Sequence, residues 1–367
     1  MSKRSGAMFL IVVVAAFLAF TSTASAGVRG LSTNLEAVNN SVGVADDLVV
    51  KVNYHNASAE DLYLPRWQTA LQGVEENLFD VRVDGRPVEY TGRLYKRGTP
   101  RAEDYVRIPA GETVSATVEL SSVYDIARTG EYSIRYRAMI QDALRADGTA
   151  KVAGVAGLRN LESNVIFVGV ERNERAIDAI ETLAQIEEAA RGNQTKYLTP
   201  GYVSCSTTRQ STLVTALSNA QSIALKARDY LNNLPSTSRS TDTAYKTWFG
   251  SYTSSRYSTV QSHYTNIYSA FSTKTFTFYC DCTDSSYAYV FANQPYRVHL
   301  CGAFWNAPMT GIDSKAGTLV HETSHFTVVA GTQDYAYGTT ACKNLAISNP
   351  DRAINNADSH EYFAETR

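Results

Sequence analysis

Cysteines and runs of basic residues are scarce in this 367-residue chain. No cysteine occurs before residue 205, no long run of basic residues occurs anywhere, and the formal net charge is −2. Without a basic patch the chain has no electrostatic footprint for nucleic acid, so nucleic-acid binding is not expected. Hydrophobic residues make up 44% and charged residues 19%, which indicates a globular protein. The length favours two domains.

Long apolar runs are also scarce, and the one candidate lies at the N-terminus. Lys3 and Arg4 precede an apolar stretch over residues 7–20, after which Ala24 and Ala26 form an A-x-A arrangement. This pattern is typical of a secretory signal peptide over residues 1–26. The alternative is a membrane anchor, for which the stretch is short. No second candidate span follows, so we expect a secreted, extracellular protein without stable membrane association.

All the cysteines lie in the second half of the chain. They are Cys205, Cys280, Cys282, Cys301 and Cys342. In an exported protein cysteines are expected to oxidise, and an odd number leaves one without a partner in the same chain. Cys280 and Cys282 are too close for an easy bridge to each other, so each is expected to pair elsewhere. A zinc knuckle is the alternative, but no matching second pair follows.

The segment from residue 27 to residue 170 has the pattern of a series of short strands. Asp84-Gly85 separates two of them and predicts a hairpin turn, and residues 113–120 and 132–137 alternate between apolar and polar side chains. Several short strands with turns between them predict an all-β, sandwich-like domain. No cysteine and no cluster of catalytic residue types occurs in it.

Residues 171–200 differ in character from the strands before them. Apolar residues recur at helical spacing among charged ones until Gly192, and a polar segment then ends in Pro200-Gly201. We expect a helix and an accessible, cleavable linker here. Residues 201–367 show long amphipathic helices, then short strands, then helices again, so the second domain is expected to be α+β.

The motif HETSH, residues 321–325, lies in the most hydrophobic helical stretch of the chain. Burying two imidazoles and a carboxylate there is costly unless a metal ion compensates. His321 and His325 are four residues apart, so both rings face one side of a helix and could bind one Zn²⁺. Glu322 is offset around the helix and could take a proton from a metal-bound water. The alternative is a chance match in a core helix.

The residues after the helix supply candidates for the rest of the site. Gly331 and Gly338 allow the chain to turn back, Asp334 offers an oxygen ligand, and the Tyr337 phenol could hydrogen-bond a developing oxyanion. No third histidine lies where a metzincin would use one, and no glutamate lies where a thermolysin-type enzyme would use one.

The combination of HExxH with the downstream pattern GTxDxxYG resembles the signature of the aspzincins, the deuterolysin-like zinc endopeptidases. The pattern is complete from His321 to Gly338. The resemblance implies one Zn²⁺ per catalytic domain, held by His321, His325 and Asp334. It further implies Glu322 as general base, Tyr337 as transition-state stabiliser and a zincin-like α+β domain.

A narrower resemblance, to the peptidyl-Lys metalloendopeptidases, covers residues 201–367. It is carried by residues 247–252, 300–305 and 356–363. It implies cleavage on the amino side of lysine, with Asp358 and Glu361 forming a negative pocket for the substrate lysine. An i, i+3 pair can present both acids to one cation, although an exposed acidic helix end is the alternative. Broad deuterolysin-like specificity also stays open, as does a non-catalytic secreted binding protein on a zincin scaffold.

The same resemblance implies two disulfides, Cys205–Cys280 and Cys282–Cys301. Cys342 is then either a free thiol or part of an intermolecular bridge.

Residues 27–200 lie outside the resemblance, and their place between signal peptide and catalytic domain predicts a propeptide. The alternative is a permanent adhesion or substrate-binding sandwich. Lys196 lies in the linker, so an enzyme that cuts before lysine could mature itself at Thr195-Lys196. No cysteine occurs in residues 27–200, so a propeptide there would not block the zinc through a cysteine switch.

Overall fold

A computed structural model describes residues 30–145, 159–172 and 199–367. The expected signal peptide, the helix and linker expected between residues 173 and 198, and the Lys196 site lie outside these residues. In the described parts, no helix combines the length and the apolar character needed to cross a membrane.

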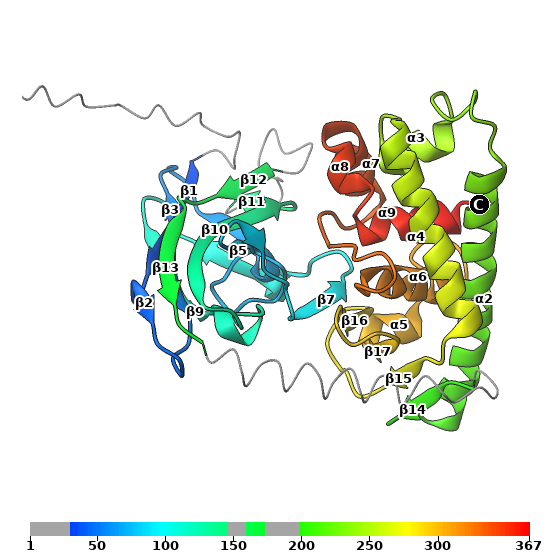
Figure 1. Ribbon diagram of the computed structural model, residues 1–367, viewed down its shortest axis with the longest axis horizontal. Coiled ribbons are helices and arrows are strands. Elements are labelled where there is room, and N and C mark those ends of the chain that lie inside the picture. Colours follow the sequence, from blue (N-terminus) through cyan, green and yellow to red (C-terminus); the bar gives the residue numbers. More distant parts are fainter. Residues whose placement is uncertain (1–29, 146–158, 173–198) are drawn as a thin grey trace, which may run out of the picture.

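The described N-terminal region is built from short strands in three sheets (Figure 1). The first, antiparallel sheet contains β1 (Leu31–Ala37), β3 (Val49–Asn56) and β9 (Thr113–Glu119), in that order. The second contains β2 (Ser41–Val42), β13 (Ile166–Val170), β10 (Gly130–Ile140), β5 (Phe79–Val83) and β6 (Arg86–Pro87), with β12 (Arg159–Glu162) also paired to β10. The third contains β11 (Leu144–Arg145), β4 (Leu62–Pro65) and β8 (Tyr105–Ile108).

Alternation of side chains explains why these strands form a core. In β10 every second residue from Tyr132 to Ile140 is buried, which is the period of a strand with one face in the core. The expected hairpin is present, with Asp84 and Gly85 at positive φ between β5 and β6. The all-β character expected for this region is confirmed.

The C-terminal region surrounds a small sheet with helices, as expected for an α+β domain. Its strands are β14 (Gly201–Val203), β15 (Thr277–Tyr279), β16 (Ala288–Phe291) and β17 (Arg297–Leu300). Its helices are α2 (Thr207–Asn233), α3 (Thr243–Phe249), α4 (Ser254–Thr273), α5 (Gly302–Asn306), α6 (Lys315–His325), α7 (Thr339–Ser348), α8 (Pro350–Ala353) and α9 (Ala357–Glu365). α2, α4 and α9 all pack against α6.

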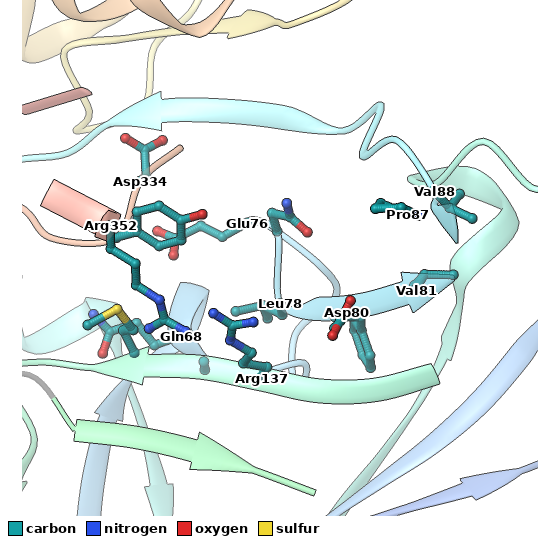
Figure 2. Close-up of a pocket in the computed structure, with 15 residues that line it drawn as sticks. Gln68, Glu76, Leu78, Asp80, Val81, Pro87, Val88, Arg137, Asp334 and Arg352 are labelled. Atoms are coloured by element: carbon teal, nitrogen blue, oxygen red, sulfur yellow. The ribbon is translucent and has the colours of Figure 1, made fainter. Parts of the chain in front are cut away.

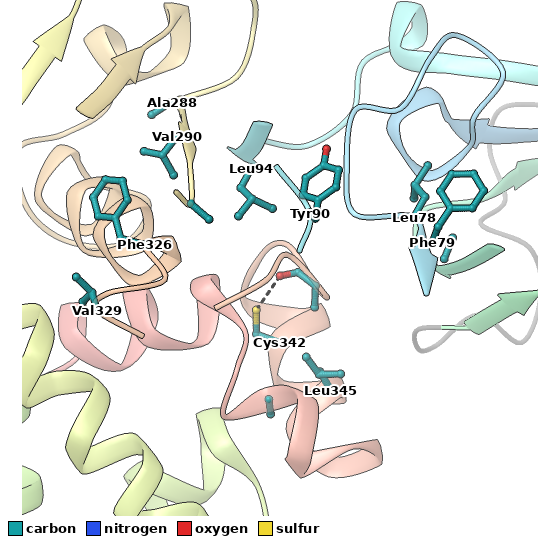
Figure 3. Close-up of a cluster of buried hydrophobic side chains, with 14 of the residues drawn as sticks. Leu78, Phe79, Tyr90, Leu94, Ala288, Val290, Phe326, Val329, Cys342 and Leu345 are labelled. Carbon is teal, nitrogen blue, oxygen red and sulfur yellow. Dashed lines mark hydrogen bonds between the residues drawn. The ribbon is translucent and has the colours of Figure 1, made fainter. Parts of the chain in front are cut away.

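One strand crosses between the two regions. β7 (Arg93–Lys96) belongs to the N-terminal region by sequence but pairs antiparallel with β16, so the C-terminal sheet has the order β14-β15-β17-β16-β7. Its Leu94 lies opposite Val290, and Figure 3 shows it between Val290 and Tyr90 within one hydrophobic cluster. The sequence pattern did not predict that β7 would pair with the sheet of the C-terminal region.

Candidate metal centre

α6 is buried along its whole length and carries the HETSH residues. Ser314 caps it by accepting a hydrogen bond from the Gly317 backbone. Gly317 also allows α9 to approach closely, because a Cβ atom there would overlap Glu365 and lie 2.9 Å from Glu361 Oε1. Tight packing of α6 against α9 brings the histidines of one helix next to the acids of the other.

Three expected metal ligands converge at the end of this helix. The Nε2 atoms of His321 and His325 are 3.1 Å apart. Asp334 Oδ1 lies 3.3 Å from His321 Nε2, and Asp334 Oδ2 lies 3.3 Å from His325 Nε2. All three side chains are inaccessible or nearly so.

The loop after α6 is fixed so that Asp334 reaches the histidines. Gly331 turns the chain back with a φ of 61°. The backbone oxygen of Thr332 accepts a hydrogen bond from His325 Nδ1 at 2.8 Å. Further along, the side-chain oxygen Oδ1 of Asn356 accepts hydrogen bonds from the backbone N–H groups of Tyr335 and Ala336, at 2.9 and 3.0 Å. These bonds hold the loop on both sides of Asp334.

The donor set fits a zinc ion. His325 Nδ1 donates to a backbone carbonyl, so its Nε2 carries a lone pair that can bind a metal. A proton on His321 Nδ1, which lies 2.7 Å from Asp358 Oδ1, leaves the Nε2 of that ring free in the same way. Both oxygens of Asp334 are buried and lack a hydrogen-bond partner among the described residues. Ligand atoms about 2.0–2.1 Å from a tetrahedral ion are about 3.3 Å apart, which matches the spacings of 3.1–3.3 Å seen here.

Glu322 lies beside this cluster without joining it. Its Oε1 accepts the backbone N–H of Lys96 at 3.2 Å, and its Oε2 has no hydrogen-bond partner in the described parts of the chain. Burial raises the pKa of Glu322 to about 7, against the opposing effect of His321 and His325. A carboxyl group with a pKa near neutrality is suited to accept and return a proton.

The Tyr337 hydroxyl is engaged by the N-terminal region. It donates a hydrogen bond to Glu76 Oε1 at 2.9 Å, and the Tyr337 backbone N–H is bound by Gln141 at 3.1 Å. Asp334 and Glu76 line the same pocket, as Figure 2 shows. Burial raises the pKa of Glu76 to about 8, although Arg97 opposes the shift.

The two acids of α9 are buried, so the alternative of an exposed acidic helix end is wrong. Asp358 Oδ1 lies 2.7 Å from His321 Nδ1, and Glu361 Oε2 lies 3.5 Å from the same atom. Carboxylates in this position orient a metal-binding imidazole. Sequence reasoning missed a third acid, Asp313, which accepts a hydrogen bond from Tyr362 at 2.7 Å.

A lysine of the N-terminal region occupies the space between these acids. Lys96 Nζ lies 2.7 Å from Glu361 Oε2, 3.1 Å from Asp313 Oδ1 and 3.7 Å from Asp358 Oδ1. Burial alone would lower the pKa of Lys96, but the three carboxylates raise it well above its ordinary value. The ammonium group is therefore charged and compensated.

The cysteines form the two bridges implied by the resemblance, Cys205–Cys280 and Cys282–Cys301. Each stabilises the fold by about 2–4 kcal/mol. Cys342 is a free and fully buried thiol that donates to the Ala336 backbone oxygen. That burial argues against an intermolecular bridge.

Comparison with known proteins places this geometry in context. The family described as lysine-specific metallo-endopeptidase, aspzincin M35, matches residues 235–365. An extracellular protease of Aeromonas hydrophila is 37% identical over 92% of both chains. A peptidyl-Lys metalloendopeptidase of Pleurotus ostreatus is 52% identical over 45% of this chain and 95% of its own. The solved zinc peptidase from Grifola frondosa is 52% identical over 44% of this chain and 97% of its own, with a TM-score of 0.42.

Proposed function

Because the chain belongs to the aspzincin M35 family of metallo-endopeptidases, we propose that it is a zinc enzyme that cuts peptide bonds on the amino side of lysine. One observation carries the lysine specificity. The Lys96 ammonium lies among three carboxylates while the backbone nitrogen of the same residue lies 3.2 Å from Glu322 Oε1. Side-chain recognition and the candidate base thus meet at the two ends of one lysine.

The residues of the site divide the chemistry among them. His321, His325 and Asp334 would hold the ion, which when bound polarises a carbonyl group and lowers the pKa of a water molecule. Glu322 takes the proton of that water and returns it to the leaving nitrogen, the position that the Lys96 N–H occupies here. Tyr337 is assigned to hydrogen-bond the developing oxyanion.

The pocket suits an ammonium better than a guanidinium. Asp313, Asp358 and Glu361 direct oxygens at a single point, at 2.7–3.7 Å from one nitrogen. A compact point charge satisfies this arrangement, whereas arginine presents a planar fork of donors. Buried carboxylates without a cation are costly, so the pocket disfavours apolar side chains as well.

We further propose that the protein is secreted after removal of residues 1–26 and is made as a precursor whose N-terminal region is a propeptide. The similarity to an extracellular protease and the two disulfides support this assignment. Maturation at Thr195-Lys196 stays a prediction. It is tested by comparing the N-termini that form in wild-type and Glu322→Ala precursors expressed alone.

Cleavage mapping tests the function itself. The processed enzyme is incubated with a mixed peptide library, with and without a chelator, and the new N-termini are sequenced. Lysine at nearly all new N-termini, abolished by the chelator and restored by zinc, is the expected result. Diverse N-termini would establish broad deuterolysin-like specificity instead. No cleavage with zinc present would leave only a binding protein on this scaffold.

A further inference from the structure

β7 lies along the C-terminal sheet as an extended peptide substrate would. Addition of a strand to an exposed sheet edge is a common mode of peptide recognition. β7 supplies four residues antiparallel to β16, from Arg93 opposite Phe291 to Lys96 opposite Ala288. The segment comes from the N-terminal region, so the protein covers the edge strand next to its own metal centre.

The side chain at the end of β7 occupies the proposed specificity pocket. Lys96 is fully buried although lysine is almost never so. Its Nζ also lies 4.9 Å from the centre of the Tyr287 ring, which adds a cation–π contact. The three carboxylates and the aromatic ring therefore contact the Lys96 ammonium as a binding site contacts a charged ligand.

The main chain of β7 is also placed as a substrate. The N–H of Lys96 belongs to the peptide bond between Tyr95 and Lys96, and it lies 3.2 Å from Glu322 Oε1. A bond cut on the amino side of lysine would present this nitrogen to the general base. The register therefore puts Tyr95-Lys96 where a scissile bond belongs.

A second contact engages the Tyr337 hydroxyl, the group assigned above to the developing oxyanion. Glu76 accepts the Tyr337 hydroxyl hydrogen at 2.9 Å. Arg97, the residue after the inserted lysine, holds Glu76 through its Nε at 3.3 Å and Glu75 through its Nη2 at 3.1 Å. The Arg97 guanidinium also stacks on Trp67 and Tyr95, at 4.5 and 4.2 Å from their ring centres. Glu76 is thus held next to Tyr337 by the residue that directly follows β7, the strand that fills the pocket.

We propose that the N-terminal region is a tethered substrate held uncleaved, with Lys96 filling the lysine pocket and Glu76 keeping the Tyr337 hydroxyl away from the Tyr95 carbonyl. The proposal rests on the function proposed above, since it takes this pocket as the one for substrate lysine. It accounts for a precursor that binds its own active site tightly and still survives.

The proposal makes Tyr95-Lys96 a latent processing site. When Glu76 no longer engages Tyr337, water oxygen bonds to the Tyr95 carbonyl carbon and the bond from that carbon to the Lys96 nitrogen breaks. Tyr95 then ends in a carboxylate, and the proton that Glu322 receives passes to Lys96 as it becomes a free amine. No other reactant is required.

The test uses the full-length, zinc-loaded precursor and reads its fragments by intact mass and N-terminal sequencing. Glu76→Ala is expected to give a fragment that begins at Lys96, and the double variant with Glu322→Ala is expected to give none. Glu75→Ala is the matched control, because Glu75 binds Arg97 but does not contact Tyr337. It should leave Tyr95-Lys96 intact.

A synthetic peptide of residues 91–100, TGRLYKRGTP, keeps the test decisive if the Glu76 variant does not fold. The peptide carries the bond without Glu76, so the processed enzyme should cut it before Lys96 and should not cut the version with alanine there. The proposal is overturned if the enzyme cuts other lysine peptides but leaves this one intact, or if the folded Glu76→Ala precursor stays whole. Failure to cut any lysine peptide would instead contradict the proposed function.

Discussion

The two regions of the molecule treat buried charge differently. Within the described residues, the buried ionisable acids and bases of the N-terminal region are Glu76, Lys96, Arg97 and Asp104. The first three meet at the metal centre, where they contact Tyr337, the α9 acids or each other. The rest of that region's core is largely aliphatic and aromatic, with Tyr54, Tyr132 and Tyr136 among its largest fully buried side chains.

The C-terminal region buries its charges in its own centre. His321, Glu322, His325, Asp358 and Glu361 are all essentially inaccessible and belong to two packed helices, α6 and α9. Buried charges are expensive unless paired or bound to metal. The C-terminal region therefore maintains a costly site, and the N-terminal region supplies a cation, Lys96, and a carboxylate, Glu76, that contact it.

The largest expected effect comes from removing the proposed base of the C-terminal region. Glu322→Gln keeps the shape of the side chain but cannot accept the proton, so kcat should fall by about 10²–10⁴-fold while zinc content stays at one per chain. Steady-state kinetics on a lysine peptide and metal analysis measure both quantities. Thr323→Val, the next residue of the same buried helix, is the control and should retain activity. Equal losses in the two variants would mean that α6 packing, not proton transfer, was disturbed.

The second test concerns the metal. Asp334→Asn removes the anionic ligand, and zinc affinity should fall by more than the roughly 10–100-fold typical of losing an outer contact. Competition with a chromogenic chelator measures the affinity directly. Asp351→Asn is the matched control, because that carboxylate lies on the surface, where it pairs with Arg256 at 2.6 Å. If both variants bind zinc like the wild type, Asp334 is not a ligand.

The third test addresses the pocket where the two regions meet. Asp313→Asn should lower kcat/KM for lysine peptides by about tenfold, and Glu361→Gln by about 100-fold, because Asp313 is partly exposed and Glu361 is not. Asp313 is the cleaner position, because of the three acids only Asp358 and Glu361 contact His321, a proposed zinc ligand. For each variant, kcat/KM is measured on a lysine peptide and on the same peptide with another residue in place of the lysine. A loss below twofold in both variants would remove this pocket from substrate recognition.

Local patterns made much of the C-terminal site predictable. The i, i+4 spacing of His321 and His325 needs only a helix to bring both rings to one face, and Gly331 needs only a turn to return Asp334 toward them. The all-β character of the N-terminal region followed from alternation. Each inference used residues within about one helical turn or one short loop.

The contacts that the sequence did not reveal are all between distant residues. Lys96 and Glu322 are 226 residues apart, and Glu76 and Tyr337 are 261 apart. Nothing in the β7 sequence marks it as the edge of another domain's sheet, since strand pairing depends on the whole fold. Asp313 was missed because no second acid lies at helical spacing from it. It reaches the pocket from the turn before α6, where its φ is 54°.

The last and smallest expected effect concerns a buried polar pair of the C-terminal region that lies outside the proposed metal centre. His263 of α4 and His360 of α9 form a buried pair with Nδ1 and Nε2 3.1 Å apart. Burial lowers the pKa of His263 to about 4 and that of His360 to about 3, below the ordinary 6.5. The unfolded chain then binds more protons, so stability present above pH 6.5 is lost as the pH falls toward 4.

His263→Asn should flatten this dependence of the free energy of unfolding on pH by up to about 1.4 kcal/mol per pH unit. Urea unfolding of the Glu322→Gln precursor between pH 5 and 7 measures the slope, with exposed His55→Asn as control. An unchanged slope would mean that His263 binds as many protons in the folded chain as in the unfolded chain, so that burial does not keep it neutral.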